Sequence, residues 1–220
     1  MSISGNPSIQ WGQFSLDDVR KIIKLILDSN KSFKIPPKKP SAKLEDHITN
    51  RFCAHLRNNK NRSTDFFCIE PQSDILDDVG ELVGRIDLKF ISGNEERIYF
   101  SFECKVLRVT RPSGQISASY NEYVKEGMYR YFNGQYAYGL DKGGMLGYVM
   151  DGDCTKSAKG VQKAIEKGRL DLYMQENETL KVSSCVALKQ VKETHHQYGP
   201  NKKFTIYHIF LPMNATPNNN

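Results

Sequence analysis

Two segments near the N-terminus repeat hydrophobic residues at helical spacing. In the first, apolar side chains recur every three or four positions: Val19, Ile22, Ile23, Ile26 and Leu27. This pattern predicts a helix over about residues 15–29, with Ser15 as its N-cap. The second places apolar residues four apart: Leu44, Ile48, Phe52 and Leu56. It predicts a helix from about 41 to 58, capped by Ser41. The proline- and lysine-rich residues 35–40 form a stiff basic connector between the two.

From residue 66 onward the period changes to that of β-strands. A short apolar run predicts a strand over 66–69, and residues 74–80 form an acidic turn. Alternation over 82–90 puts Ile86, Leu88 and Phe90 on one face, and Arg85, Asp87 and Lys89 on the other. Over 98–106, one face carries Phe100, Phe102 and Cys104, and the opposite face carries Tyr99, Ser101, Glu103 and Lys105. The turn at 92–94 makes these two strands an antiparallel hairpin.

The second half of the chain alternates helices and strands. A loop over 107–116 precedes a helix over about 117–132, whose apolar positions favour core packing. A strand over 143–150 and a lysine-rich helix over about 155–168 follow, and a late strand pair occupies 181–191 and 204–211. His195 and His196 fall in a polar turn before the last strand, whereas His208 fits a hydrogen-bonded core position. The fold class is therefore α/β, divided into an N-terminal helix with connector (1–40), an α/β domain (41–211) and a polar tail (212–220).

Composition limits the classes of function. The chain has a formal charge of +6 and a pI near 9.0, which is compatible with a polyanionic partner and equally with an ordinary basic protein. Five cysteines without any CxxC pair favour reduced thiols rather than a zinc knuckle or a disulfide framework. We expect no signal peptide and no membrane span, and hence a cytoplasmic protein.

Chemistry-bearing residues gather on the predicted hairpin. Glu103 and Lys105 share a strand face, and Asp87 lies near the end of the paired strand. Two carboxylates beside a lysine on a half-buried face need a compensating partner, and a divalent cation provides one. The alternative is a solvated sheet face with cross-strand ion pairs. Glu45, at the edge of the second helix's apolar stripe, either joins this group or is an ordinary exposed helix residue.

The segments Gly84–Leu88, with Asp87, and Phe102–Val106, with Glu103-Cys-Lys105, resemble the PD-(D/E)xK, or restriction-endonuclease-like, nucleases. That family's proline before the aspartate is replaced by Ile86. The resemblance implies an αβββαβ core, a central mixed sheet flanked by helices, over about residues 42–150. It also implies Mg²⁺, replaceable by Mn²⁺, held by Asp87, Glu103 and the backbone carbonyl of Cys104. Lys105 would then position the attacking water, and Glu45 would support the metal site.

The same resemblance implies a metal-dependent nuclease that acts most often on DNA, as in bacterial restriction or antiphage defence. It also implies that a protein partner supplies recognition or control, and that the chain forms a homodimer if it cuts both strands. Two alternatives stay open. One is a catalytically silent fold that binds nucleic acid or a partner protein, and the other is an RNase on the same scaffold.

Basic residues around this centre are candidates for phosphate contacts: Arg108, Arg111, Lys125 and Arg130. The late helix carries a lysine stripe made of Lys156, Lys159, Lys163 and Lys167, which could follow a phosphate backbone or be a solvated face. The acidic group Asp74, Asp77 and Asp78 fits a solvated loop better than an additional metal site.

Overall fold

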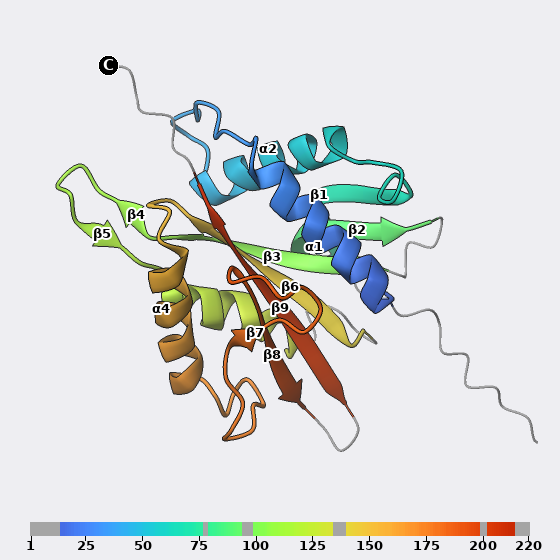
Figure 1. Cartoon of the computed structure of the whole chain (residues 1–220), viewed down its shortest axis with the longest axis vertical. Helices are drawn as coiled ribbons and strands as arrows, with labels where there is room; N and C mark the ends of the chain where they lie inside the picture. The colour runs from blue at the N-terminus through green and yellow to red at the C-terminus, as the bar shows by residue number, and fades with distance from the viewer. Residues whose placement is uncertain (1–13, 77–78, 94–98, 134–139, 199–201, 214–220) are drawn as a thin grey trace, which may run out of the picture.

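A computed structural model describes residues 14–76, 79–93, 99–133, 140–198 and 202–213, and it has a mixed α/β architecture (Figure 1). One seven-stranded sheet runs in the order β1-β2-β3-β6-β9-β8-β7. Its strands are β1 (Phe67–Leu76), β2 (Leu82–Ser92), β3 (Tyr99–Leu107), β6 (Lys142–Val149), β7 (Lys181–Val182), β8 (Val191–Gln197) and β9 (Lys203–Pro212). The central strands β3, β6 and β9 are parallel, and the flanking pairs on both sides are antiparallel. The predicted α/β class is confirmed.

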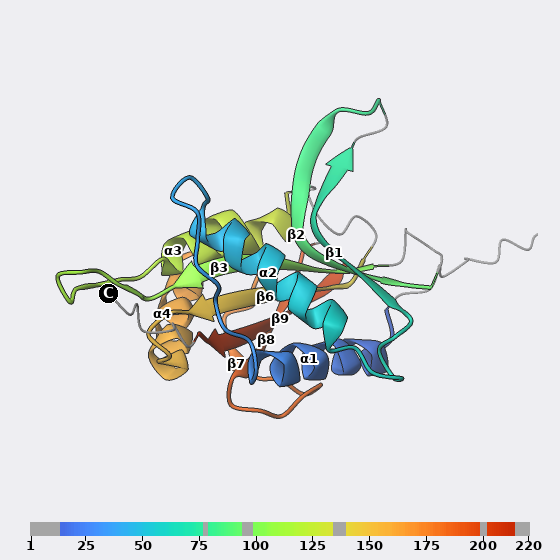
Figure 2. The ribbon, with the colours of Figure 1, turned by 90° about the horizontal axis from the view of Figure 1, so that it is seen from above.

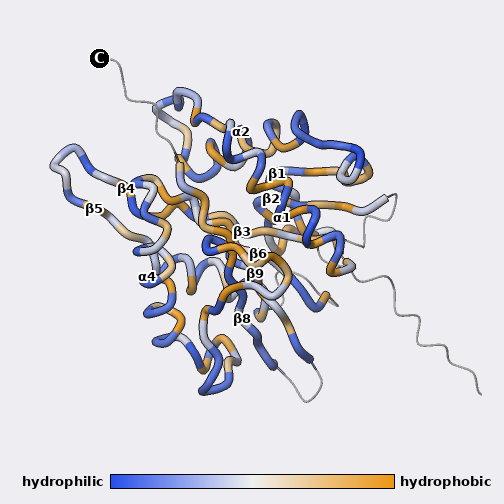
Figure 3. Tube along the Cα trace, viewed as in Figure 1, coloured by the Kyte–Doolittle hydropathy of each residue, from blue (hydrophilic) through white to orange (hydrophobic). Residues whose placement is uncertain are grey.

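Helices cover both faces of this sheet. Helices α1 (Leu16–Asn30) and α2 (Leu44–Asn58) pack on one face, in a core that includes Phe52, Phe102 and Tyr148. On the other face lie α4 (Cys154–Lys167) and a helical segment over residues 120–131, in a second core. Hydrophobic residues accordingly follow the central strands between the two layers (Figure 3). None of the helices in the described ranges has the length and hydrophobicity that a bilayer crossing requires.

The first helix begins as predicted, but the second does not. Ser15 caps α1 by accepting a hydrogen bond from the backbone N–H of Asp18 at 3.1 Å. Helix α2 starts three residues later than expected, at Leu44, and its N-cap residue is Lys43, without a side-chain cap. Ser41 therefore lies outside the helix, in the turn that follows the proline-rich connector. Both Ser41 and Lys43 precede the acidic residues of the first turn, so the sequence pattern could not decide which of the two is the N-cap.

The first two strands are longer than predicted and form a projecting hairpin. Strand β1 continues through Asp74 to Leu76, which pair with residues 82–85 of β2. We call residues 73–76 and 79–85 the arm; Figure 2 shows it bending away from the rest of the sheet. Residues 74–76 of the predicted acidic turn are thus strand. Both faces of the hairpin are exposed there, so backbone hydrogen bonds extend it without an apolar pattern that the sequence could reveal. Asp77 and Asp78 lie outside the described residues.

The bend of β2 changes the faces of its side chains. Leu88 and Phe90 join the core under α1 and α2, whereas Ile86 joins the core on the opposite face. The prediction that all three share one face is wrong for Ile86, because the strand twists as it leaves the sheet. Asp87 lies at this change of direction and is only 8% exposed.

The helical segment after β3 is irregular rather than one α-helix over 117–132. It consists of α3 (Tyr120–Glu122), a π-helical turn η1 (Tyr123–Gly127) and a 3₁₀ turn η2 (Met128–Tyr131). Before it, the predicted loop contains a two-stranded hairpin of β4 (Val109–Thr110) and β5 (Ile116–Ser117). A Cβ added to Gly127 would lie 2.5 Å from the terminal methyl group of Met145, so a larger residue there would require the Met145 side chain to shift. π-helical turns often occur at functional sites.

The late strands differ from the prediction around the histidines. Residues 183–190 are not strand, and β8 instead includes His195 and His196, which the sequence placed in a polar turn. His196 is buried and His208 is fully buried, as expected for the latter. The period-two pattern of Val191, Glu193 and His195 was obscured because polar residues fill both faces of this strand.

The two buried histidines belong to one directional hydrogen-bond chain. The Leu172 carbonyl can only accept, so His196 donates from Nδ1 to it (2.7 Å), and its Nε2 accepts from the Thr194 hydroxyl (2.7 Å). The Thr194 oxygen then accepts from Nε2 of His208 (2.9 Å). Finally, Nδ1 of His208 accepts from the Tyr123 hydroxyl at 3.1 Å. Both imidazoles are therefore neutral, and the chain ties β8 and β9 to η1.

This network predicts acid-sensitive stability. Burial lowers the pKa of His196 from 6.5 to about 4, so between these values the unfolded chain binds a proton that the folded chain does not. The stabilisation is complete above pH 6.5 and is lost as the pH falls toward 4, by at most about 3 kcal/mol for this residue. Urea unfolding between pH 7 and 4 should show this loss. His196→Asn, which retains a donor to Leu172, should weaken the dependence, and the part that remains should come from His208, whose pKa burial also lowers.

The matched control is His195→Asn on the same strand, where the side chain is 39% exposed. It should keep the slope of the wild-type protein. Equal slopes for the wild-type protein and His196→Asn would contradict the assignment of a neutral buried imidazole.

Candidate active site

The site is organised by a gap between two strands. Pairing of β2 with β3 extends from Ile91–Tyr99 only to Leu88–Phe102, after which β2 turns away. Strand β3 continues alone on that side while it pairs with β6 on the other. Its backbone groups that would have met β2 therefore need other partners.

Two carboxylates replace the missing strand. The backbone N–H of Cys104 donates to Oδ2 of Asp87 at 2.8 Å, and that of Val106 donates to Oε2 of Glu45 at 3.0 Å. Because the N–H and C=O of a strand residue point to the same side, the Cys104 carbonyl also faces the gap that Asp87 borders. Backbone N–H groups thus hold Asp87 and Glu45 at the edge of β3 that has no strand partner.

A second group of charges lies beside the first. Glu103 is fully buried, and its Oε1 accepts from Nζ of Lys105 at 2.7 Å. The same ammonium group donates to Oε1 of Glu45 at 3.0 Å. On the other side, Oε2 of Glu103 accepts from Nη1 of Arg130 at 3.1 Å. Two carboxylates and two cations therefore form one continuous chain of ion pairs around the end of β3, beside Asp87.

Burial governs the protonation of this cluster. Burial and the nearby charge of Asp87 raise the pKa of Glu103 to about 7, against the opposing effect of Lys105. Burial also raises the pKa of Asp87, although the Cys104 N–H and Lys105 oppose the change. For Lys105, burial alone would lower the pKa, but the negative charges of Glu103 and Glu45 outweigh it and raise the pKa. Burial thus makes the ionised form of both carboxylates less favourable, whereas the lysine remains an ammonium ion.

The members of the cluster come from four elements: Glu103 and Lys105 lie on β3, and Asp87 lies on β2. Glu45 lies in the first turn of α2, where the helix dipole favours a carboxylate. Arg130 comes from η2, which follows Gly127 of η1, where an added Cβ would lie 3.4 Å from the Glu103 side chain. The structure brings together Glu45, Asp87, Glu103 and Lys105, as the sequence analysis anticipated.

Arg130 and Gln72 give the site two features that the sequence did not reveal. Arg130 was predicted to bind nucleic acid, whereas its guanidinium contacts a buried carboxylate of the site and is still about one-third exposed. Gln72 on β1, with a positive φ of 52°, donates from Nε2 to Oδ1 of Asp87 at 3.4 Å. A glutamine in a left-handed backbone conformation has no sequence signal that would have identified it.

The predicted phosphate contacts divide between buried and exposed positions. Arg108 is 8% exposed, and it forms an ion pair with Asp151 at 2.6 Å and a hydrogen bond with the Tyr120 hydroxyl. This arrangement ties the ends of β3 and β6 to α3 and does not offer the guanidinium to a ligand. Arg111, in the β4–β5 hairpin, and Lys125, on η1, are both exposed.

Oxygen donors around the gap suit a hard divalent cation. Asp87 and Glu103 provide carboxylates and Cys104 a carbonyl, and Mg²⁺ takes one or two protein carboxylates while keeping several waters. The raised pKa of Glu103 indicates a carboxyl group that a cation would help to ionise. Over the described residues, no group of three or more Cys, His, Asp or Glu side chains is already arranged as a metal site. A cation would therefore draw Glu103 partly away from Lys105 and Arg130.

Comparisons with known proteins add no relative: no family model, curated protein or solved structure matches this chain.

The geometry predicts that Lys105 stabilises the fold as well as the site. Lys105→Met would leave Glu103 buried with a single cation and would remove the partner of Glu45. Breaking a buried charge pair in this way should lower the free energy of unfolding by about 3 kcal/mol, measured by urea denaturation. The exposed Lys125→Met should change it by no more than about 0.5 kcal/mol. Similar losses in both variants would show that the buried charges are not coupled as described.

Proposed function

We propose that this protein is a divalent-metal-dependent nuclease that hydrolyses phosphodiester bonds, with DNA as the favoured substrate. The observation that carries the proposal is the gap between β2 and β3. There Asp87 and Glu45 cap the free edge of β3, while Glu103 and Lys105 lie on the same strand end. Acidic oxygen ligands and one lysine are thereby concentrated at one unpaired strand edge, an arrangement that suits metal-assisted phosphodiester hydrolysis.

The order of elements supports the same proposal. Helix α2 precedes three antiparallel strands, and the segment 120–131 then connects β3 to the parallel strand β6. This is the order that the resemblance to restriction-endonuclease-like enzymes implies for an αβββαβ core. Glu103 and Lys105 lie near the end of β3, as the resemblance implies, whereas Asp87 lies in the middle of β2, where β2 leaves β3.

Each residue can be given a role. Asp87, Glu103 and the Cys104 carbonyl would hold Mg²⁺, or Mn²⁺ in its place, which supplies the Lewis acid for the reaction. Lys105 remains an ammonium ion and would orient the attacking water and the scissile phosphate. Glu45 fixes Lys105 through their 3.0 Å contact, so it acts as a positioning residue.

Exposed cations favour a polyanionic substrate. Arg130 is partly exposed beside Glu103, while Arg111 in the β4–β5 hairpin and Lys125 on η1 are exposed elsewhere on the surface. Together with the formal charge of +6, they would attract a phosphate backbone. The proposal includes a protein partner that supplies recognition or control, as in restriction or antiphage defence.

Cleavage assays with Mg²⁺, Mn²⁺ or EDTA should test the activity on plasmid, linear duplex, single-stranded DNA and RNA. We expect metal-dependent cutting of DNA, and a loss of at least about 100-fold in Asp87→Asn and Lys105→Gln, because these remove a ligand or the positioned cation. Both substitutions keep a polar side chain, and circular dichroism would verify that the variants are folded.

The control is Asp171→Asn, which changes an exposed carboxylate outside the site and should leave cleavage intact. If only RNA is cut, the substrate would be RNA, and the proposed roles of the site residues would stand. Full activity in both site variants, or no metal-dependent cutting of any substrate, would overturn the proposal. In the second case, a catalytically silent module that binds nucleic acid or a protein partner would be the better description.

A further inference from the structure

The arm presents an apolar and acidic surface to solvent. Four large hydrophobic residues near its end are between 40% and 83% exposed: Leu76, Val79, Leu82 and Val83. Leu76 and Leu82 are cross-strand partners, so they lie side by side. The sequence from Asp74 to Arg85 contains four acidic residues and one basic residue, Arg85, which forms an ion pair with Asp74 at 2.7 Å. Clustered exposed hydrophobic residues of this kind mark a protein interaction surface, and the negative charge disfavours nucleic acid.

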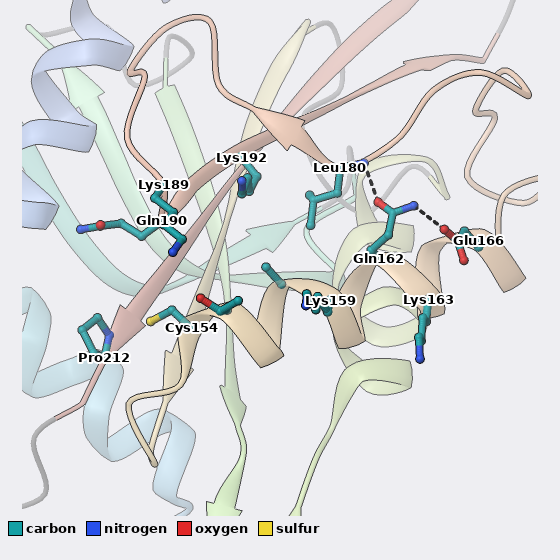
Figure 4. A pocket seen from close by; sticks show the side chains of 12 residues that line it. Cys154, Lys159, Gln162, Lys163, Glu166, Leu180, Lys189, Gln190, Lys192 and Pro212 are labelled. Carbon is teal, nitrogen blue, oxygen red and sulfur yellow. Dashed lines mark hydrogen bonds between the residues drawn. The ribbon is translucent and has the colours of Figure 1, made fainter.

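A groove of opposite charge lies between α4 and β8. Its volume is about 590 Å³, within the range of ligand-binding pockets. Ala158, Leu180 and Pro212 contribute an apolar lining, and four lysines surround it: Lys159, Lys163, Lys189 and Lys192 (Figure 4). One acidic residue, Glu166, also lines the groove and accepts a hydrogen bond from Gln162.

The lining favours a protein segment over nucleic acid. Single-stranded nucleic acids bind through stacking on aromatic side chains, and none of the described residues that line this groove is aromatic. A phosphate backbone would use the lysines but would leave the apolar lining without a contact. An acidic segment with exposed hydrophobic side chains would satisfy both features, and the arm has this composition.

We propose that the arm of one molecule docks into the lysine-rimmed groove of a second copy of this chain. Within one molecule the two surfaces are on different sides: the arm projects beyond the β1–β2 edge, whereas α4 lies at the far side of the sheet (Figures 1 and 2). Leu76 and Leu82 would cover the apolar lining, and the net negative charge of the sequence from Asp74 to Arg85 would complement Lys163 and Lys189.

This contact is head-to-tail, because different surfaces meet. Pairing of two arms would bring acidic residues together, so charge repulsion disfavours the symmetric alternative. A head-to-tail contact extends into chains or closes into rings. Each molecule would then contact one neighbour through its arm and another neighbour through its groove. The proposal is independent of the nuclease activity and uses no residue of the candidate active site.

Analytical ultracentrifugation of the full chain up to about 0.5 mM provides the test, since small exposed interfaces associate weakly. The wild-type protein should increase in average mass with concentration, and the increase should be reduced by high salt. The arm variant, Leu76→Ser with Leu82→Ser, should stay monomeric, as should the groove variant, Lys163→Glu with Lys189→Glu. A 1:1 mixture of the two variants should form a dimer that grows no further, because only one intact arm and one intact groove can meet.

Lys24→Glu with Lys167→Glu is the matched control, since it changes the same charge at two positions outside the groove; it should associate like the wild-type protein. A monomeric wild-type protein over the whole range would overturn the proposal, and so would a mixture that remains monomeric although the wild-type protein associates. Loss of DNA binding in the groove variant, together with a monomeric wild-type protein, would assign the groove to nucleic acid instead.

Discussion

The site depends on one constraint: β2 pairs with β3 only from Leu88 onward, so the part of β2 before Leu88 is separated from β3. This separation leaves backbone donors at Cys104 and Val106 without a strand partner, and buried donors of this kind are costly unless they are satisfied. Asp87 and Glu45 satisfy them at 2.8 and 3.0 Å. The carboxylates are consequently fixed by the sheet itself rather than by flexible loops. The same separation sends β2 outward and creates the arm.

Two cations, Lys105 and Arg130, partly balance the carboxylates at this end of β3. Lys105 bridges Glu103 and Glu45, and Arg130 contacts the other oxygen of Glu103. The raised pKa of Glu103 shows that the two cations do not offset the effects of burial and of Asp87 completely. In the proposed chemistry, a divalent cation at this centre would help to ionise Glu103, which connects the fold to the proposed function.

Much of this centre could be predicted from the sequence, because strand periodicity fixes which side chains share a face. Alternation along β3 placed Glu103 and Lys105 together, and the hairpin register brought Asp87 close to them. The position of Ile86 could not be predicted, since it depends on the twist of β2 where it leaves the sheet. The burial of Arg108 is equally invisible in the sequence, because its partner Asp151 follows 43 residues later, beyond a strand and an irregular helix.

Location of a bound metal ion tests the central claim most directly. Crystals grown with Mn²⁺ would be examined by anomalous diffraction at the manganese absorption edge. We predict one strong peak in the gap between β2 and β3, about 2.1 to 2.3 Å from oxygens of Asp87, Glu103 and the Cys104 carbonyl. With Mn²⁺ present in excess, the absence of a peak there, or a peak only at another group of side chains, would contradict this account of the site.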